Sequence, residues 1–280
     1  TQDEEMCTDY SSPYTTDVCS FSGLSTGEHT LDAVIVNSSG QAISDVSGLD
    51  ADANVMIGFG GKYVTAVGDS IFNGVGDNNT SDNDALNGKN LSRGFTPPLN
   101  DLLSGTYGVP VAVYNEGLGG TTSNQGLSRI AGTMAVHPQS QLWLLMFGTN
   151  DSSGTFPLMS GLGCTPADFS AGTSGCLNTY KHNMSRIIDA IEAAGQFVAL
   201  AKVPFVNDTT SVRDDLIREY NLCIDELVQE RSLSVTPPDF YTLFEQNPGL
   251  LFDNVHPNGS GYQEMATMWH DAIVQSGLFN

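Results

Sequence analysis

The sequence has little positive charge and no long apolar run. It contains 10 Lys and Arg against 32 Asp and Glu, which gives a formal net charge of -22 over 280 residues. That charge repels nucleic-acid backbones, and the few cations are scattered between Lys62 and Arg231 without a basic cluster. The longest apolar stretches, such as Leu142 to Phe147, fall far short of the roughly 20 residues that cross a bilayer. We therefore expect no nucleic-acid partner and no membrane span.

Cysteines are also few, and they form a pattern. Cys7 and Cys19, and Cys164 and Cys176, are each twelve residues apart in segments rich in Ser, Thr, Gly and Asp. Two loop-closing disulfides are the prediction, and they indicate an oxidising extracellular or periplasmic compartment. The chain begins without an initiator Met or a signal-peptide pattern, so we expect a processed or trimmed chain rather than the primary product. The remaining Cys223 falls on the apolar stripe of an expected helix, which favours a buried, inert thiol.

The first 61 residues differ from the rest of the chain. Residues 1–61 are rich in Ser, Thr, Asp and Gly and contain one strand-like run, Leu31 to Val36. We read them as a β-rich N-terminal extension, either the remnant of a preceding β-sandwich module or a strand added to the main sheet. Residues 62–280 then form the main domain, which is long enough to bury one sizeable core.

From Tyr63 onward, short apolar strands alternate with helical stretches. The expected strands are Tyr63 to Val67, Val111 to Tyr114, Leu142 to Phe147 and Phe197 to Val203, and the clearest helices are Leu177 to Ala194, Thr210 to Arg231 and Gly259 to Ser276. This alternation predicts an α/β fold in which helices cover a parallel sheet. Two polar stretches, Gly76 to Gly94 and Ser152 to Gly175, are long for connections and are expected to serve function.

The first motif with chemical meaning is the turn Gly68-Asp69-Ser70, which ends an apolar strand. Ser70 is thereby placed at the carboxyl end of a strand, the edge where open parallel sheets bind ligands. Because position 72 is Phe, the turn is not the Gly-x-Ser-x-Gly elbow of ordinary α/β-hydrolases. On its own the tripeptide is common, and a simple turn serine is the alternative interpretation.

Three further blocks follow in an order that fits the first. Asn115 to Ser123 is rich in glycine and follows a strand, so its backbone N–H groups can approach a ligand. Phe147 to Asp151 follows the strongest buried strand and offers the amide of Asn150. Asp253 to Pro257 precedes the last helix, and its Asp253-to-His256 spacing lets a carboxylate orient an imidazole.

These four blocks together resemble those of the SGNH hydrolase superfamily, the GDSL-type esterases and lipases. The resemblance implies a three-layer α/β/α sandwich with a central, mostly parallel five-stranded sheet. It implies Ser70 as the nucleophile, His256 as the base and Asp253 as its orienting carboxylate. The oxyanion donors would be the N–H groups of Ser70 and Gly120 and the amide of Asn150, with Gly119 as the alternative to Gly120.

The leading functional hypothesis is thus a secreted serine ester hydrolase acting on short acyl esters, with no metal or organic cofactor. Its partner is a small ester or an acetylated glycan, so the alternatives are a polysaccharide O-acetyl esterase and a non-catalytic glycan-binding module. Asp69 and Asp151 flank the proposed site, and we expect their carboxylates to stabilise turns. His137 is expected at a helix end or strand entry. Nothing in the sequence indicates the oligomeric state.

Overall fold

A computed structural model describes residues 27–34, 52–59, 62–79, 94–109, 111–154, 157–207 and 211–279. The strands are β1 (Gly27–Val34), β2 (Asp52–Phe59), β3 (Lys62–Gly68), β4 (Val111–Gly117), β5 (Leu142–Met146) and β6 (Phe197–Leu200). The helices are α1 (Ser70–Asn73), α2 (Thr96–Tyr107), α3 (Ser123–Val136), α4 (Pro166–Ala171), α5 (Tyr180–Ala193), α6 (Ser211–Arg231), α7 (Phe240–Gln246) and α8 (Gly259–Ser276), with a 3₁₀ turn η1 (Pro248–Leu250). The alternation predicted from residue 63 onward is confirmed, as is the α/β fold class.

The main sheet is parallel and runs in the order β4-β3-β5-β6. The chain leaves β3 for β4 on one side and then crosses to β5 on the other side, so the strand order reverses at β3. Gly68 at the end of β3 pairs with Gly117 of β4 and with Met146 of β5. This register brings the loops that follow three strands to one edge, at the kind of switch point where open α/β sheets bind ligands.

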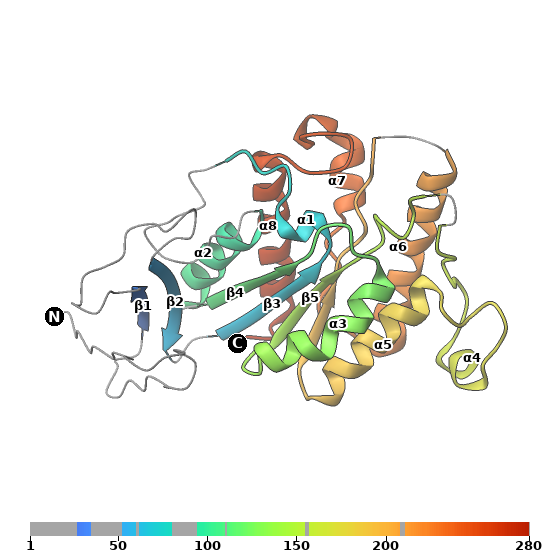
Figure 1. Cartoon of the computed structure of the whole chain (residues 1–280), viewed down its shortest axis with the longest axis horizontal. Helices are drawn as coiled ribbons and strands as arrows, with labels where there is room; N and C mark the ends of the chain where they lie inside the picture. Colours follow the sequence, from blue (N-terminus) through green and yellow to red (C-terminus); the bar gives the residue numbers. More distant parts are fainter. Residues whose placement is uncertain are drawn as a thin grey trace.

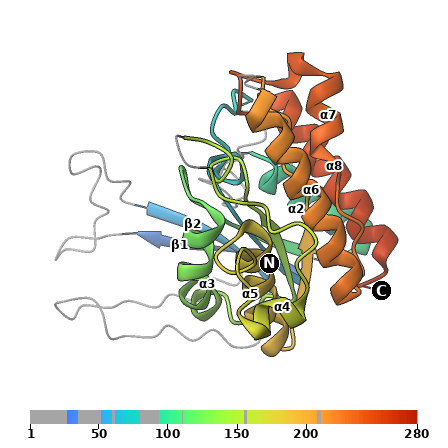
Figure 2. The ribbon, with the colours of Figure 1, turned by 90° about the vertical axis from the view of Figure 1, so that its right-hand side faces the viewer.

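Helices cover both faces of the sheet, which makes three layers (Figure 1, Figure 2). Along β5, Leu142 and Leu144 point into a core shared with α2, α7 and α8, whereas Trp143 and Leu145 point into a core shared with α3, α5 and α6. Every residue of β5 is buried because both of its faces are covered. The side-chain alternation of a strand thus divides one apolar run between two cores.

The described part of the chain contains four strands of this sheet, not the five that the family resemblance implies. The segment 234–238 follows α6, where the chain returns toward β6, and the N–H of Lys202 donates to the carbonyl of Pro238 at 3.0 Å. Pro237 and Pro238 have no N–H to return to a neighbouring strand. The segment therefore adds a single ladder-like contact here and no regular strand.

The N-terminal segment contains a β-hairpin-like pair that is separate from the main sheet. β1 and β2 pair antiparallel in full register, from Gly27 with Phe59 to Val34 with Asp52. The strand-like run expected at Leu31 to Val36 corresponds to β1, which begins four residues earlier and ends two residues earlier. Neither strand is hydrogen-bonded into the β4-β3-β5-β6 sheet. The division into residues 1–61 and 62–280 stays a prediction.

The three helices predicted with bounds are all present. The expected Leu177 to Ala194 is α5, which begins where the Thr179 side chain caps its N-terminus. α6 and α8 match their expected ranges to within one residue, and Gly277 in the left-handed region ends α8. None of the described helices combines the length and the apolar character needed to cross a bilayer.

Candidate active site

Ser70 lies at a sharp turn between β3 and the short helix α1. The side chain of Asp69 caps α1 by accepting the N–H of Ile71 at 2.9 Å, and Gly74 ends the helix with a φ of 85°. Gly68 is required before this turn because a Cβ there would lie 2.6 Å from the Phe72 ring and 2.7 Å from the Met146 carbonyl oxygen. Ser70 is the first residue of α1, so the helix leaves its N–H without an internal partner.

A continuous chain of hydrogen bonds joins Ser70 to His256 and Asp253. His256 Nε2 lies 3.0 Å from Ser70 Oγ, and His256 Nδ1 lies 2.9 Å from Asp253 Oδ2. Partial burial raises the pKa of Asp253, but hydrogen bonds from the backbone and ring of His256 and from Val255 N–H outweigh it and leave this pKa below its ordinary value. Asp253 is therefore ionised at neutral pH and able to orient the imidazole.

The loop that holds Asp253 and His256 is a compact turn before α8. The N–H of Phe252 donates to the carbonyl of His256 at 2.7 Å, and Leu251 forms an isolated bridge with Pro257. Asp253 Oδ1 accepts the N–H groups of Val255 and His256, each at 2.7 Å. The three-residue spacing is therefore sufficient, because the Asp253 carboxylate binds both the imidazole of His256 and the backbone of the same loop.

The segment after α1 packs against this loop at Gly76. A Cβ at Gly76 would lie 2.7 Å from the Pro257 carbonyl oxygen and 3.0 Å from the Cβ atoms of His256 and Phe252, and its φ is +90°. The hydroxyl of Tyr262 on α8 donates to the neighbouring Val75 carbonyl at 2.8 Å. Gly76 therefore lets the chain that leaves the Ser70 helix press directly on the His256 loop. The single sequence offered only a glycine in a polar stretch as a signal for it.

The glycine-rich loop after β4 lies against Ser70. The N–H groups of Leu118 and Thr121 are bonded to the carbonyls of Gly68 and Leu118, whereas those of Gly119 and Gly120 have no partner in the described part of the chain. A Cβ on Gly119 would come within 3.9 Å of Ser70 Cβ, and Gly120 has a φ of +75° in open space. Gly119 thus lies beside Ser70, Gly120 follows it in the same loop, and the choice of Gly120 for the oxyanion N–H stays a prediction.

Asn150 lies in the loop that follows β5 and is tied to the glycine loop. Its amide nitrogen donates to the carbonyl of Thr121 at 2.9 Å. An amide has two N–H groups, so this bond fixes the side chain and leaves one N–H for a ligand. The hydroxyl of Thr121 in turn lies 3.3 Å from the Gly68 carbonyl oxygen, so the loops after β3, β4 and β5 form one connected unit.

Asp69 and Asp151 do stabilise turns, as expected from the sequence. Asp151 accepts the backbone N–H of Ser123 at 3.0 Å and the hydroxyl of Ser123 at 2.5 Å, and the Asn183 amide also donates to that hydroxyl. Asp151 thereby anchors the Asn150 loop to the start of α3. Burial raises the pKa of Asp151 against the hydrogen bonds from Ser123, and burial likewise raises the pKa of Asp69.

Arg129 on α3 is a site residue that the sequence did not reveal. One of its terminal nitrogens donates to the carbonyls of Gly68 at 3.0 Å and of Glu116 at 2.8 Å, at the carboxyl ends of β3 and β4. Burial lowers its pKa, which the nearby Glu116 opposes. A single sequence does not indicate that an arginine on this helix reaches the turn that carries Ser70.

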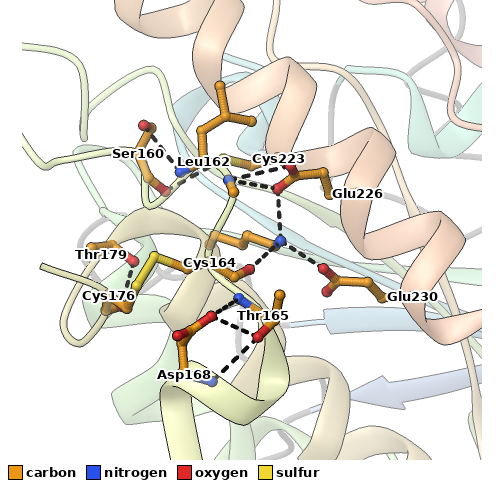
Figure 3. Close-up of polar contacts among 12 residues, drawn as sticks. Ser160, Leu162, Cys164, Thr165, Asp168, Cys176, Thr179, Cys223, Glu226 and Glu230 are labelled. Carbon is orange, nitrogen blue, oxygen red and sulfur yellow. Dashed lines mark hydrogen bonds and ion pairs between the residues drawn. A yellow bond between two sulfur atoms is a disulfide. The ribbon is translucent and has the colours of Figure 1, made fainter. Parts of the chain in front are cut away.

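The long polar loop of residues 157–179 is held to α5 and α6 away from Ser70. Cys164 and Cys176 form the predicted disulfide, and the nearly buried ammonium of Lys181 bonds the Cys164 carbonyl and the carboxylates of Glu226 and Glu230 (Figure 3). Cys223 is a buried free thiol, as predicted, and burial raises its pKa to about 12. The second pair, Cys7 and Cys19, lies outside the described residues.

The other candidate groups have structural contacts. His137 ends α3, as expected, and its Nε2 lies 2.7 Å from Glu116 Oε1. Among the described residues, no three His, Cys, Asp or Glu side chains come together as a metal site would need.

Comparisons with known proteins give the family through a family model and the fold through solved structures. The family model described as GDSL-like Lipase/Acylhydrolase matches residues 66–264. A lipase/acylhydrolase from Enterococcus faecalis is 21% identical with a TM-score of 0.52, covering 77% of this chain and 96% of its own. A catalytic mutant of an acetylxylan esterase from Geobacillus stearothermophilus is 17% identical with a TM-score of 0.55, covering 76% and 94%. A lipase from a goat rumen metagenome is 17% identical with a TM-score of 0.55, and the match covers 75% of this chain and 97% of the lipase chain. A comparison with curated protein sequences gives no significant match.

Proposed function

The chain belongs to the GDSL-like lipase/acylhydrolase family, a family of ester hydrolases, and from this premise we propose that it is a serine esterase that cleaves short-chain acyl esters. The observation that carries the proposal is the hydrogen-bonded chain from Asp253 through His256 to Ser70, which ends beside the glycine loop. In this proposal Ser70 is the nucleophile, His256 the general base and Asp253 the group that orients it.

The geometry suggests how the first half of the reaction would proceed. A serine hydroxyl is a weak nucleophile, so His256 Nε2 takes the proton of Ser70 Oγ as that oxygen attacks the ester carbonyl. Asp253, which stays ionised, stabilises the imidazolium that forms. The imidazolium then gives its proton to the leaving alcohol, and an acyl group remains on Ser70.

Negative charge develops on the carbonyl oxygen during this attack. The N–H of Ser70, the N–H of either Gly119 or Gly120, and the second amide N–H of Asn150 are the donors available to it among the described residues. Loss of one such donor typically costs about 10²–10³ in rate. Water activated by His256 releases the acyl group in the second half of the reaction.

A short acyl chain is proposed because the surroundings of Ser70 are mostly polar. The loop that carries Asn150 continues into Ser152, Ser153 and Gly154, and the glycine loop offers one exposed apolar side chain, that of Leu118. Among the described residues, Phe252, beside Asp253, is the other large exposed apolar side chain near the triad. Burial of each CH₂ of an acyl chain contributes about 0.8 kcal/mol to binding. Two isolated side chains offer little surface on which a long chain could be buried.

The test is hydrolysis of p-nitrophenyl esters from acetate to palmitate by the wild type and by Ser70→Ala. We expect turnover that falls with acyl length and is lost in Ser70→Ala, with unchanged melting of the variant. Turnover that survives in Ser70→Ala would contradict the assignment of the nucleophile. A maximum at palmitate would contradict the short-chain part alone.

A second candidate is an O-acetyl esterase that trims secreted polysaccharide. Its support is the likeness of fold to the acetylxylan esterase and the disulfide, which suits an extracellular or periplasmic location. Acetate release from acetylated xylan, measured beside p-nitrophenyl acetate, tests it, with chemically deacetylated xylan as the blank. Binding of xylan without acetate release, and without covalent labelling of Ser70, would favour the non-catalytic glycan-binding module.

A further inference from the structure

Phe252 is an exposed aromatic residue beside the proposed triad, and the mechanism above gives it no role. It directly precedes Asp253, it is 60% exposed, and it is part of neither apolar core of the described chain. An aromatic side chain contributes to binding when its faces are removed from water. Single exposed apolar residues are common on protein surfaces, so the direction in which Phe252 points is what matters.

The backbone of the turn places Phe252 and His256 on the same side. Leu251 and Pro257 form an antiparallel bridge, and the next pair inward is joined by the bond from the Phe252 N–H to the His256 carbonyl at 2.7 Å. Directly opposed residues of an antiparallel pair point to the same face. In agreement, a Cβ added at Gly76 would lie 3.0 Å from the Cβ atoms of both Phe252 and His256. The side chain of Phe252 therefore leaves the turn beside the imidazole.

The chemistry of ester cleavage decides which part of a substrate would lie there. After Ser70 Oγ attacks, the imidazolium gives its proton to the oxygen of the leaving alcohol, so that oxygen has to come within hydrogen-bond distance of His256 Nε2. The carbonyl oxygen is directed instead to the donors of the glycine loop and Asn150. The alcohol part of the ester therefore lies on the His256 side of the site, which is the side of Phe252.

We propose that Phe252 is a specificity-determining residue that binds the alcohol part of the ester, and that this alcohol carries a six-membered ring. The inference rests on the proposed esterase function. The broad apolar face of such a ring covers an aromatic side chain, whereas a small acyclic alcohol leaves most of it in water. Sugar pyranoses and alicyclic alcohols share this face. The next residues of the turn, Asp253 and Asn254, are polar and exposed, which favours the hydroxylated ring of a sugar.

The experiment compares cyclohexyl acetate with isopropyl acetate in the wild type and in Phe252→Ala. Both are acetates of secondary alcohols, so they differ in the ring and not in the acyl group. The ratio of their kcat/KM values cancels any effect of the mutation on His256 that the two esters share. We expect the wild type to prefer the cyclohexyl ester and this preference to fall by roughly tenfold in Phe252→Ala, because a few CH₂ groups lose their contact. An unchanged ratio would overturn the proposal, even if both rates fell.

A conservative variant separates the ring from the rest of the side chain. Phe252→Tyr retains an aromatic face, so it should keep the wild-type preference, and it carries the test if Phe252→Ala does not fold. Because Phe252 is largely exposed, we expect the melting temperature of Phe252→Ala to stay close to that of the wild type. A Phe252→Tyr variant that folds but loses the preference would contradict binding by the aromatic face.

Two control variants remove exposed apolar side chains elsewhere. Phe197 is 51% exposed, but it begins β6 and so lies at the end of the parallel sheet opposite to Ser70. Leu118 is 53% exposed and lies in the glycine loop, on the side of the oxyanion donors. The ratio of the two acetates should keep its wild-type value in Phe197→Ala and in Leu118→Ala. A fall in either control as large as that in Phe252→Ala would contradict a role specific to Phe252.

The acyl group gives a second arm. If Phe252 contacts the alcohol part, the ratio of kcat/KM for p-nitrophenyl butyrate and p-nitrophenyl acetate should be the same in the wild type and in Phe252→Ala. A change in this ratio as large as the change between the two alcohols would place Phe252 against the acyl chain and overturn the assignment.

A further pair of substrates distinguishes the two kinds of ring. A monoacetate of methyl xylopyranoside is measured beside cyclohexyl acetate, each relative to isopropyl acetate. A larger loss in Phe252→Ala for the xyloside would support a sugar as the alcohol, and a larger loss for cyclohexyl acetate would support an apolar ring. A loss for neither would overturn the proposal.

Ser70→Ala, measured on the same esters, separates this inference from the proposed function. Hydrolysis that depends on Ser70, with a ratio that Phe252→Ala leaves unchanged, would retain the esterase and refute the role of Phe252. If the wild type hydrolyses none of these esters, the proposed function is refuted and this inference with it.

Discussion

The two segments that bring the proposed triad together are built in opposite ways. The Ser70 turn is buried, and its neighbour Gly68 offers one carbonyl to Leu118, Thr121 and Arg129, so three donors from two other elements hold it. The Asp253–His256 loop is largely exposed, with 47% of the Asp253 side chain accessible, and its polar contacts are mainly within the loop itself. Contacts along the whole sheet edge therefore set the position of Ser70, whereas a local turn sets the position of His256.

This difference predicts which mutations will act on chemistry and which on stability. Groups in the Asp253–His256 loop have few other contacts, so changing them should remove activity and leave the fold. Groups around the Ser70 turn connect several elements, so changing them should affect both. Each prediction below tests that division, in order of decreasing effect.

Asp253→Asn should cause the largest loss of activity with the smallest loss of stability. The amide no longer stabilises the imidazolium and can hold the wrong tautomer, so we expect kcat to fall by about 10⁴-fold. Because Asp253 is half exposed, the melting temperature should change little. Kinetics with p-nitrophenyl acetate and a thermal melt of the same sample measure both.

The matched variant is Asp151→Asn, which changes a buried carboxylate that anchors Ser123. It should cost about 1–3 kcal/mol of unfolding free energy, because a buried donor loses its charged acceptor. If Asp253→Asn unfolds the protein as readily as Asp151→Asn does, the contrast between the two segments is wrong.

Gly76→Ala should show that the two segments depend on each other. The new Cβ would meet the Pro257 carbonyl oxygen and the Cβ of His256, and the φ of +90° adds strain for any residue with a Cβ. A shift of about 1 Å in His256 can cost about 10²-fold in rate. We expect that loss in kcat/KM, with a smaller change in the melting temperature.

The control for Gly76→Ala is Gly108→Ala. Gly108 ends α2 with a φ of +65°, but a Cβ there meets no atom within 4 Å. It carries the strain of a left-handed residue without the collision, so it should lose stability and keep its activity. Equal activity losses in the two variants would remove Gly76 from the positioning argument.

The sequence predicted those parts of the site that depend on local order along the chain. Ser70, Gly120 and Asn150 each follow a strand, and the carboxyl ends of parallel strands meet at one edge, so their proximity could be expected without coordinates. Asp253 and His256 are three residues apart, and their contact needs only one turn. The family resemblance supplied the roles, and the geometry brought the side chains within hydrogen-bond distance.

Other features could not be read because they depend on pairs of distant residues. Arg129 meets the Gly68 carbonyl 61 positions away, and Gly76 meets His256 across the closed fold, and a single sequence records neither contact. The apolar pattern does not delimit α3, because the glycines of this helix weaken it. Its start was nevertheless marked by the capping box of Thr122 and Gln125. The expectation of a fifth strand came from the resemblance alone. Pro237 and Pro238, which have no N–H to donate, argue against a regular strand at that place in the sequence.

Arg129→Gln should give the smallest effect and sharpen the comparison most. The change removes the guanidinium that joins the ends of β3 and β4, while the Gly68 carbonyl keeps its bonds from Leu118 and Thr121. Hydrogen bonds to a charged donor contribute about 1.5–3 kcal/mol, and part of that should appear as stability. Because Ser70 would then be less well fixed against the glycine loop, we also expect kcat to fall by about tenfold with KM unchanged.

The matched control is Arg218→Gln on α6. Arg218 forms ion pairs with Asp214 and Glu245, but half of its side chain is exposed, and it is not part of the connected loops after β3, β4 and β5. Exposed pairs contribute about 0–1 kcal/mol, so this variant should change neither kcat nor the melting temperature appreciably. A lower melting temperature in Arg129→Gln with unchanged kcat would show that Arg129 holds the two strands together without positioning the nucleophile. A tenfold loss of kcat in that variant and not in Arg218→Gln would show that the position of Ser70 is set by contacts across the whole sheet edge.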